Sequence, residues 1–125
     1  MKTSRKLNEY EYQLMLRMTE TFPSRAQFLA ELKEAEVIPW IPENYPDDPS
    51  IEFVSKVQVP SAVTDGVPVE GLFKDQKGKR VHVLLHVRNN LVKILEFYKD
   101  DSSSIKVLPD LTNLEVLSLF DWKGN

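Results

Sequence analysis

Cysteine is absent from this chain of 125 residues, and glycine is scarce. Without cysteine the chain has no disulfide bridge, no thiol nucleophile and no cysteine-ligated zinc or iron–sulfur site. Long apolar runs are also missing, because the longest aliphatic stretch, Val83-Leu84-Leu85, is far short of the roughly 20 residues that cross a bilayer. The basic first residues lead into polar ones, without the apolar core of a secretory signal. These absences predict a cytoplasmic protein that has no membrane partner.

The glycines that are present, at positions 66, 71, 78 and 124, are isolated from one another. They cannot form a phosphate-cradling loop, so we expect no nucleotide and no other cofactor. The composition, with 42% hydrophobic and 28% charged residues, is that of a folded domain. A chain of this size buries roughly two thirds of its unfolded surface around one core. We therefore predict a single domain over residues 1–125.

Acidic residues are concentrated in the middle of the chain, although the formal net charge is only −3. Residues 34–70, the acidic segment, hold eight Asp and Glu residues against Lys56, a net charge of −7. Such a segment repels the phosphate backbone of nucleic acids, whose binding depends on lysine and arginine. It attracts a basic protein partner instead. The alternative is that the segment is a solvated surface that keeps the protein soluble.

Two antiparallel helices are predicted before residue 36. Asn8 can cap the first, Glu11 completes a capping box, and Pro23 ends the helix. Ser24 with Gln27 forms a second capping pattern that opens the next helix. Both helices carry apolar residues at helical spacing, which we expect to face the core: Leu7, Tyr10, Leu14, Met18 and Phe22 in the first, and Phe28, Leu29, Leu32 and Ala35 in the second.

A run of strands follows the helices. Alternating apolar and polar residues predict strands at 50–54, 56–59, 67–74, 80–88, 91–98 and 115–120. Because helices and strands do not alternate along the chain, parallel β-α-β units are excluded. The predicted fold is α+β, with two N-terminal helices packed on a mainly antiparallel sheet of about five to six strands.

A two-residue turn at Asn89-Asn90 predicts how the two longest strands pair. In such a hairpin the numbers of opposing residues sum to 179. The core-face pairs are then Val87 with Val92, Leu85 with Ile94, Val83 with Glu96 and Val81 with Tyr98. Glu96 is therefore expected to be a buried carboxylate that needs a partner, such as Arg80, Lys99 or a backbone amide.

Four prolines between residues 39 and 49 predict an extended surface segment. Aromatic residues stand there among acidic ones, a mixture typical of protein-binding surfaces. Alternatively, Trp40 and Tyr45 fold back over the core as a lid. The candidate partner-binding residues are Trp40, Glu43, Tyr45, Asp47, Asp48 and Glu52.

His82 and His86 are the two histidines of the chain. Along a strand, at roughly 3.3 Å per residue, they lie about 13 Å apart, too far to share a metal ion. Neither has a recognisable nucleophile partner for acid–base catalysis. We therefore expect no metal site and no catalytic residue.

Several segments occur in an order that resembles a known family. They are 5–11 (RKLNEYE), 49–53 (PSIEF), 81–87 (VHVLLHV), 95–98 (LEFY) and 108–110 (LPD). The chain resembles a family of small bacterial proteins of unknown function that share this order of motifs. It departs from the family pattern at Asn90, where the hairpin turn often carries glycine, and residues 39–48 have no counterpart.

Small bacterial domains of this kind are similar in character to immunity proteins of toxin systems. The resemblance implies no established catalytic residue. Together with the acidic segment, it leads us to expect a non-enzymatic immunity protein that neutralises a basic toxin domain by direct binding. The alternative is a small enzyme or ligand-binding domain that uses the sheet face of His82 and His86.

Overall fold

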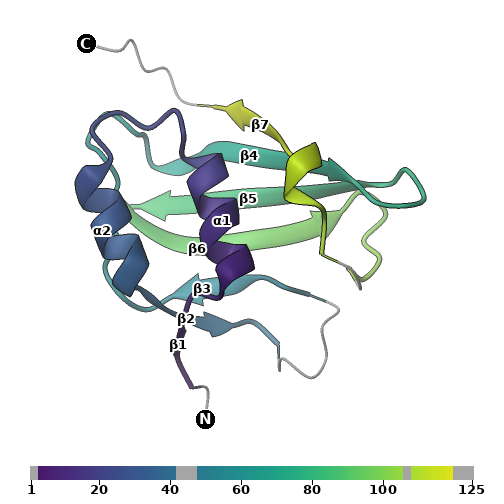
Figure 1. Cartoon of the computed structure of the whole chain (residues 1–125), viewed down its shortest axis with the longest axis horizontal. Coiled ribbons are helices and arrows are strands. Elements are labelled where there is room, and N and C mark those ends of the chain that lie inside the picture. Colours follow the sequence, from purple (N-terminus) through teal and green to yellow (C-terminus); the bar gives the residue numbers. More distant parts are fainter. Residues whose placement is uncertain (1–2, 42–47, 106–107, 120–125) are drawn as a thin grey trace.

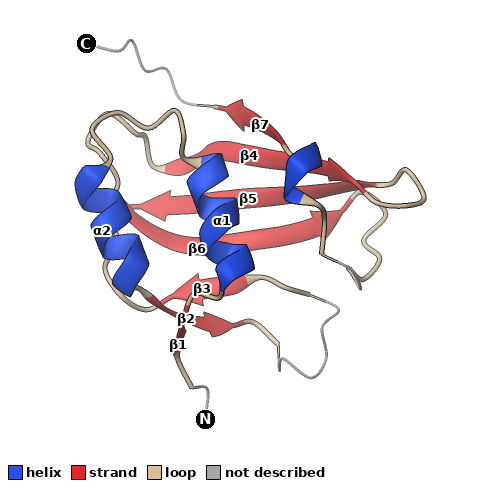
Figure 2. Ribbon diagram, in the orientation of Figure 1, coloured by secondary structure: helices blue, strands red, loops and turns tan. Residues whose placement is uncertain are grey.

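One antiparallel sheet carries both helices on the same face (Figures 1 and 2). This computed structural model describes residues 3–41, 48–105 and 108–119. Its strands are ordered β1-β2-β3-β6-β5-β4-β7 across the sheet. The elements are β1 (Arg5–Lys6), α1 (Glu9–Met18), α2 (Ala26–Glu34), β2 (Glu36–Pro39), β3 (Ile51–Phe53), β4 (Gly66–Lys74), β5 (Arg80–Arg88), β6 (Leu91–Lys99), a 3-10 turn at Leu111–Asn113 and β7 (Glu115–Ser118).

The sheet has seven strands in the described part of the chain, not five to six. Two short strands were missed, because β1 has only two residues and β2 ends at Pro39. A proline is accommodated at such a strand end, where its missing N–H is not needed. Residues 56–59 were wrongly predicted as a strand, since they make only an isolated bridge between Gln58 and Leu91. The prediction of an antiparallel α+β fold is confirmed.

The predicted start of α1 is confirmed, and the predicted start of α2 is wrong. The side chain of Asn8 accepts a hydrogen bond from the Glu11 backbone N–H at 2.8 Å, and the Glu11 carboxylate accepts one from the Asn8 N–H at 3.0 Å. Arg5 holds the same buried carboxylate through both guanidinium NH groups. Ser24, in contrast, lies in the left-handed region (φ 44°), and α2 begins after Arg25 without a side-chain cap.

The core lies between the helices and the face of the sheet that they cover. Leu14, Met15 and Met18 of α1 and Phe28 and Leu32 of α2 are buried there. The sheet contributes Val37, Ile51, Phe53, Val69, Phe73, Val81, Val83, Leu85, Val87, Val92, Leu95 and Phe97. Leu114 packs where Gly71 leaves room, because a Cβ at Gly71 would lie 2.9 Å from its Cδ1 atom. The C-terminal segment that carries β7 is thereby anchored on β4.

The predicted turn between β5 and β6 is confirmed, but the predicted pairing of the two strands is correct only for the residues next to the turn. Asn89 and Asn90 have φ angles of 54° and 61°, as a type I′ hairpin turn requires. Val87 pairs with Val92 as expected, and an irregularity between His86 and Val87 then shifts the ladder by one residue. Beyond it the pairs are His86 with Ile94, Leu85 with Leu95, Leu84 with Glu96, Val83 with Phe97 and His82 with Tyr98.

This shift reverses the faces that were predicted for the residues of β6 after the bulge, Ile94 to Tyr98. Leu95 and Phe97 are buried in the core, whereas Ile94, Glu96 and Tyr98 lie on the opposite face. The expectation of a buried Glu96 opposite Val83 was therefore wrong. A one-residue slip moves every side chain of a strand to the other face, so one bulge is sufficient to cause the error.

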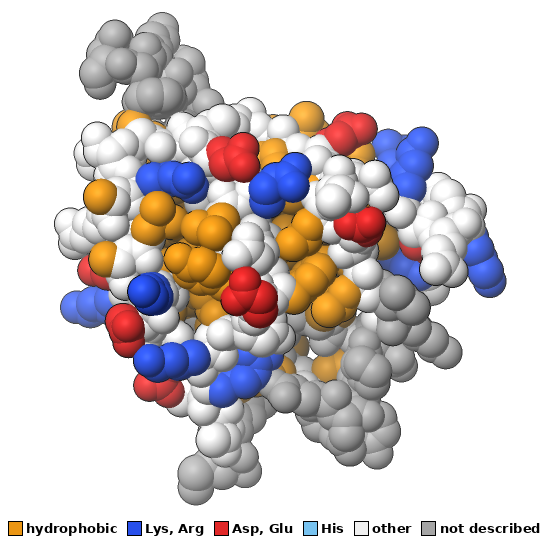
Figure 3. All heavy atoms as spheres, in the orientation of Figure 1, with side chains coloured by type: hydrophobic (Ala, Val, Ile, Leu, Met, Phe, Trp, Pro, Cys, Tyr) orange, Lys and Arg blue, Asp and Glu red, His pale blue; other side chains and the backbone are white. Residues whose placement is uncertain are grey.

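The helix side of the molecule has charged side chains around a central apolar area (Figure 3). Tyr10, Tyr12 and Leu29 of the helices are half-buried and pack against the core. The Tyr10 hydroxyl donates a hydrogen bond to the Pro109 carbonyl at 2.7 Å. This contact ties α1 to the segment that leads into β7.

Candidate functional site

The face of the sheet opposite the helices, here called the open face, carries no described helix. Its side chains alternate along each strand with those of the core. Nine of its residues are Glu52 from β3, Glu70 and Leu72 from β4, His82, Leu84 and His86 from β5, and Ile94, Glu96 and Tyr98 from β6; Ile38 of β2 and Glu115 and Leu117 of β7 lie on the same face. All nine residues are half-buried or exposed. The open face therefore places both histidines and several carboxylates on a surface with apolar residues between them.

His82 lies between two carboxylates on this face. Its Nδ1 atom is 2.5 Å from Glu70 Oε2, its Nε2 atom contacts Asp100 Oδ1, and its ring stacks on Tyr98 with the centroids 4.6 Å apart. The Arg80 Nε atom lies 3.1 Å from the other oxygen of Asp100. Since ionised carboxylates only accept hydrogen bonds, this arrangement fits an imidazolium that donates from both ring nitrogens.

The surroundings of His82 favour its charged form. Partial burial lowers the pKa of His82, but the hydrogen bonds and negative charges of Glu70 and Asp100 together outweigh this effect and raise it above its ordinary value of 6.5. Partial burial, followed by the charges of Glu70 and Asp100, also raises the pKa of Tyr98. A histidine held as an imidazolium is a charge partner for carboxylates and cannot accept a proton as a general base.

His86 belongs to a separate pair on the open face. Its Nε2 atom is 2.8 Å from Glu96 Oε1, so the partner of Glu96 is His86, not one of the predicted groups. Among the described residues no group of three or more histidine, aspartate or glutamate side chains is arranged to hold a metal ion. The two histidines thus occupy one face but contact different carboxylates.

The predicted partner-binding residues that the structure describes lie around β2 and β3. Trp40 follows β2 and is half-buried, with its backbone N–H donating to the Ser50 carbonyl at 3.0 Å. The Asp48 carboxylate accepts a hydrogen bond from the Ser50 N–H at 3.0 Å. Glu52 is exposed on β3, directly opposite Ile38 and Ile94. The other three candidates, Glu43, Tyr45 and Asp47, lie outside the described residues.

Several other carboxylates of the acidic segment make local contacts at separate places. Asp65 accepts hydrogen bonds from the Asn89 and Asn90 N–H groups of the β5–β6 turn, and these bonds lower the pKa of Asp65. Glu34 pairs with Lys6, and Glu36 accepts a hydrogen bond from the Ser4 hydroxyl. The charge imbalance that the sequence shows is therefore distributed over several elements.

The contacts of Glu70, Tyr98 and Asp100 with His82 were not predicted from the sequence. Their placement depends on the register of β4, β5 and β6, which the bulge in the last pair obscured. The sequence did contain a sign of the bulge. Val92 and Leu95 are both strongly apolar, but they are an odd number of positions apart, which in a regular strand would place them on opposite faces. Both can face the core only if a bulge separates them.

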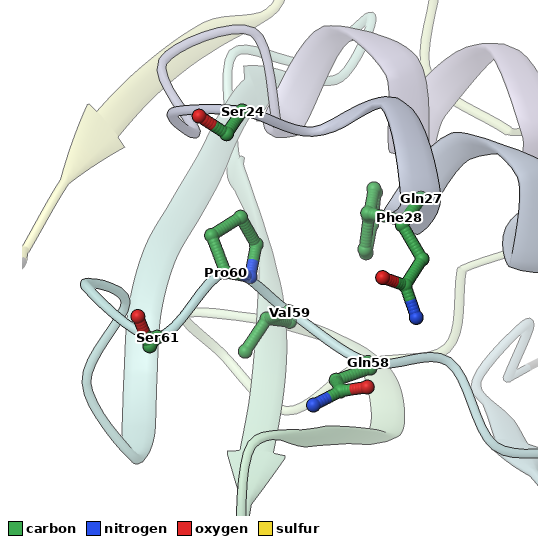
Figure 4. Close-up of a pocket in the computed structure, with 7 residues that line it drawn as sticks. All are labelled: Ser24, Gln27, Phe28, Gln58, Val59, Pro60 and Ser61. Carbon is green, nitrogen blue, oxygen red and sulfur yellow. The ribbon is translucent and has the colours of Figure 1, made fainter.

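A pocket of about 250 Å³ lies between α2 and residues 58–61 (Figure 4). Phe28, Val59 and Pro60 form its apolar part, and Gln27 and Gln58 lie beside them. No ionisable side chain is among its lining residues. The pocket therefore has fewer side chains that could bind a charged ligand or transfer a proton than the open face has.

The fold and the open face define a two-layer α+β arrangement in which no described helix covers one face of the sheet. The chain belongs to the family described as Domain of unknown function (DUF6984), whose model matches residues 4–109. Neither the curated proteins nor the solved structures contain a match. No helix in the described part is both long and apolar enough to cross a membrane. The family description assigns no activity.

Proposed function

We propose that this chain is a non-enzymatic binding protein of the immunity type, which neutralises a basic toxin domain by direct contact. The partner docks on the open face and on the adjoining end of β2, where Trp40 lies. Glu52 and Asp48 belong to this interface, as do the sequence-predicted Glu43, Tyr45 and Asp47. Bacterial origin and cytoplasmic location are parts of the same proposal.

The observation that carries this proposal is the composition of the open face. Leu72, Leu84 and Ile94 are half-buried on this face, Glu70 and Glu96 lie on either side of Leu84, and Glu52 lies opposite Ile94. Protein interfaces combine apolar with polar side chains. Carboxylates among the apolar residues complement a basic partner and speed its association.

The second candidate, a small enzyme or ligand-binding domain, is favoured by the presence of both histidines on the open face. The contacts of His82 weigh against it, because both of its ring nitrogens contact carboxylates. A catalytic histidine needs a free nitrogen within reach of substrate. His86 contacts Glu96 through Nε2, so this candidate would depend on the Nδ1 atom of His86. The contacts of His82 thus support charge pairing at that residue more than acid–base chemistry.

The experiment begins with the gene next to the one that encodes this chain. If that gene encodes a toxic protein with a basic domain, the domain is purified and its binding to this chain is measured, together with rescue of growth on co-expression. Two results would contradict the proposal. One is a neighbouring gene that belongs to a metabolic operon, and the other is a neighbouring toxin that this chain neither binds nor neutralises.

Trp40→Ala tests the predicted anchor. We expect faster dissociation, by an amount worth about 2 kcal/mol, because buried aromatic anchors carry much of the binding energy of an interface. Tyr12→Ala is the control, since Tyr12 is a half-buried aromatic residue of the helix layer. Equal effects of the two substitutions would argue against an interface at Trp40. Urea denaturation of both variants separates lost binding from lost folding.

A further inference from the structure

The outer edge of β7 presents backbone groups that can pair with another strand. The Leu119 N–H donates to the Pro68 carbonyl at 2.6 Å, and the register pairs Glu70 with Leu117 and Leu72 with Glu115. Hydrogen-bonded residues alternate along an antiparallel ladder. The N–H and C=O groups of Val116 and Ser118 therefore point away from β4. β7 is the last strand of the sheet, so no described strand meets these groups (Figure 1).

The two edges of the sheet differ in how they are protected. The opposite edge is β1, which has two residues, both of them basic. Short length and positive charge are common means of blocking edge-to-edge association. β7 has neither lysine nor proline, and beside its edge Leu117 is 47% exposed and Leu119 is 56% exposed. The β7 edge therefore lacks the protection that β1 has.

We propose that two copies of this chain pair through their β7 strands, antiparallel and about a two-fold axis at Leu117. Val116 of one copy then exchanges hydrogen bonds with Ser118 of the second copy, and the reverse pair forms on the other side of the axis. The result is one continuous sheet across both copies. β7 lies beyond the residues matched by the family model, and the proposal does not depend on the open-face partner.

A second copy fits this edge because the strand is complementary to itself. The N–H and C=O groups of Val116 and Ser118 meet outward-pointing groups of the second copy only when the numbers of opposing residues add up to an even number. Among these registers, the proposed one pairs Val116 with Ser118. Leu117 then faces Leu117 of the second copy, and Glu115 faces Leu119. No two carboxylates oppose each other, which would destabilise the pairing. The exposed leucines of both copies form one apolar ridge.

The expected dimer is weak. A pairing of two four-residue strands buries much less than the roughly 800 Å² per partner of a standard stable interface. We therefore expect dissociation constants in the range of about 10 µM to 1 mM. Sedimentation equilibrium over this range should show a reversible change from monomer to dimer. A wild-type chain that stays monomeric over this whole concentration range would overturn the proposal. The β7 edge would then be available to a strand of a different protein.

Single cysteines test the register, because the chain has none of its own. Leu117→Cys places two thiols opposite each other at a non-hydrogen-bonded pair, where Cα atoms lie about 4.5 Å apart, within disulfide range. Leu119→Cys is the matched control, since its thiols would be roughly four residues, or about 13 Å, out of register. With oxidised glutathione, cross-linked dimer should form at least about tenfold faster for Leu117→Cys. Equal rates, or the reverse order, would overturn the register.

Charge at the edge tests whether β7 is the contact. Leu117→Lys should raise the dissociation constant of the dimer at least about tenfold, because a lysine on an edge strand opposes its symmetry mate. Val54→Lys adds the same charge at a side chain that is 50% exposed and far from β7 in sheet order, and it should change the constant less than about twofold. A dimer that withstands Leu117→Lys but not Val54→Lys would place the contact elsewhere.

Discussion

The two faces of β5 show how one strand serves two purposes. The side chains that point to the helices, Val81, Val83, Leu85 and Val87, are between 0 and 3% exposed. Those that point away, His82, Leu84 and His86, are all half-buried, and both histidines contact carboxylates. The side chains of the covered face are all apolar, because burying apolar surface against the helices stabilises the fold. The open face is mixed, so its composition is set by something other than packing.

This difference also separates two sources of stability. Burial on the covered face depends little on pH, whereas the pairing of Glu70 and Asp100 with His82 on the open face depends on the charge of that histidine. The core can therefore hold the fold while the charge of His82 on the open face changes with pH. The following predictions test this separation, starting with the largest effect.

Truncating a leucine should cost far more on the covered face than on the open one. Leu85 is completely buried, so Leu85→Ala should lower the free energy of unfolding by about 3 to 5 kcal/mol. Leu84→Ala, at the neighbouring half-buried position, should cost about 1 kcal/mol. Urea denaturation of both variants measures the difference. Similar losses would mean that the open face is covered in solution.

Replacing both histidines should weaken the protein without abolishing its activity. The double variant His82→Asn and His86→Asn loses contacts to Glu70, Asp100 and Glu96, which we expect to lower the free energy of unfolding by about 1 to 2 kcal/mol at pH 6. Partner binding or growth rescue should persist. A double variant that remains folded but is inactive would favour the enzyme or ligand-binding alternative.

The contribution of His82 should depend on pH with a definite sign. Its pKa is raised in the folded state, so the stability that it adds is fully present below its ordinary value of 6.5 and is lost as pH rises through the higher folded value. The ring proton resonances of His82, followed by NMR, give that value directly. Asp100→Asn and Glu70→Gln should each lower the measured pKa of His82. An unchanged pKa of His82 in both variants would contradict the placement of His82 between Glu70 and Asp100.

Local chemistry explains what the sequence predicted well. The capping box of Asn8 and Glu11 and the turn at Asn89-Asn90 involve residues a few positions apart, and the structure contains both. The apolar stripes of the helices were also predicted, since Leu14, Met18, Phe28 and Leu32 are buried. These features depend on neighbouring residues and not on the rest of the fold.

The errors arose where distant segments decide the outcome. β1 exists because Arg5 and Lys6 pair with Val37 and Glu36, far along the chain, which a two-residue pattern does not reveal. The bulge in β6 reassigned Glu96 from the core to the open face. The cluster at His82 brings together β4, β5 and the end of β6, so its contacts followed only from the observed register. Which face the helices leave uncovered is likewise a property of the whole fold.

The smallest expected effect on stability concerns the charge of the open face, and it tests the partner most directly. Glu52 is exposed, so Glu52→Lys should change the free energy of unfolding by less than about 0.5 kcal/mol. It should nevertheless slow association with a basic toxin domain and flatten the salt dependence of the rate, because rim charges act mainly on the encounter. Reversing Glu43, Asp47 and Asp48 together should have a larger effect of the same kind.

Glu20→Lys is the matched control for this charge reversal. It makes the same change of net charge, at a carboxylate whose side chain is 61% exposed just after α1, where it faces Arg17. If the partner responds only to the overall charge of the protein, Glu20→Lys and Glu52→Lys will slow association equally. If it docks on the open face, the Glu52 variant will be the slower one, and the gap will close at high salt as the charges are screened. Stopped-flow association at two salt concentrations distinguishes these outcomes, and equal rates at both would leave the acidic segment as a solvated surface.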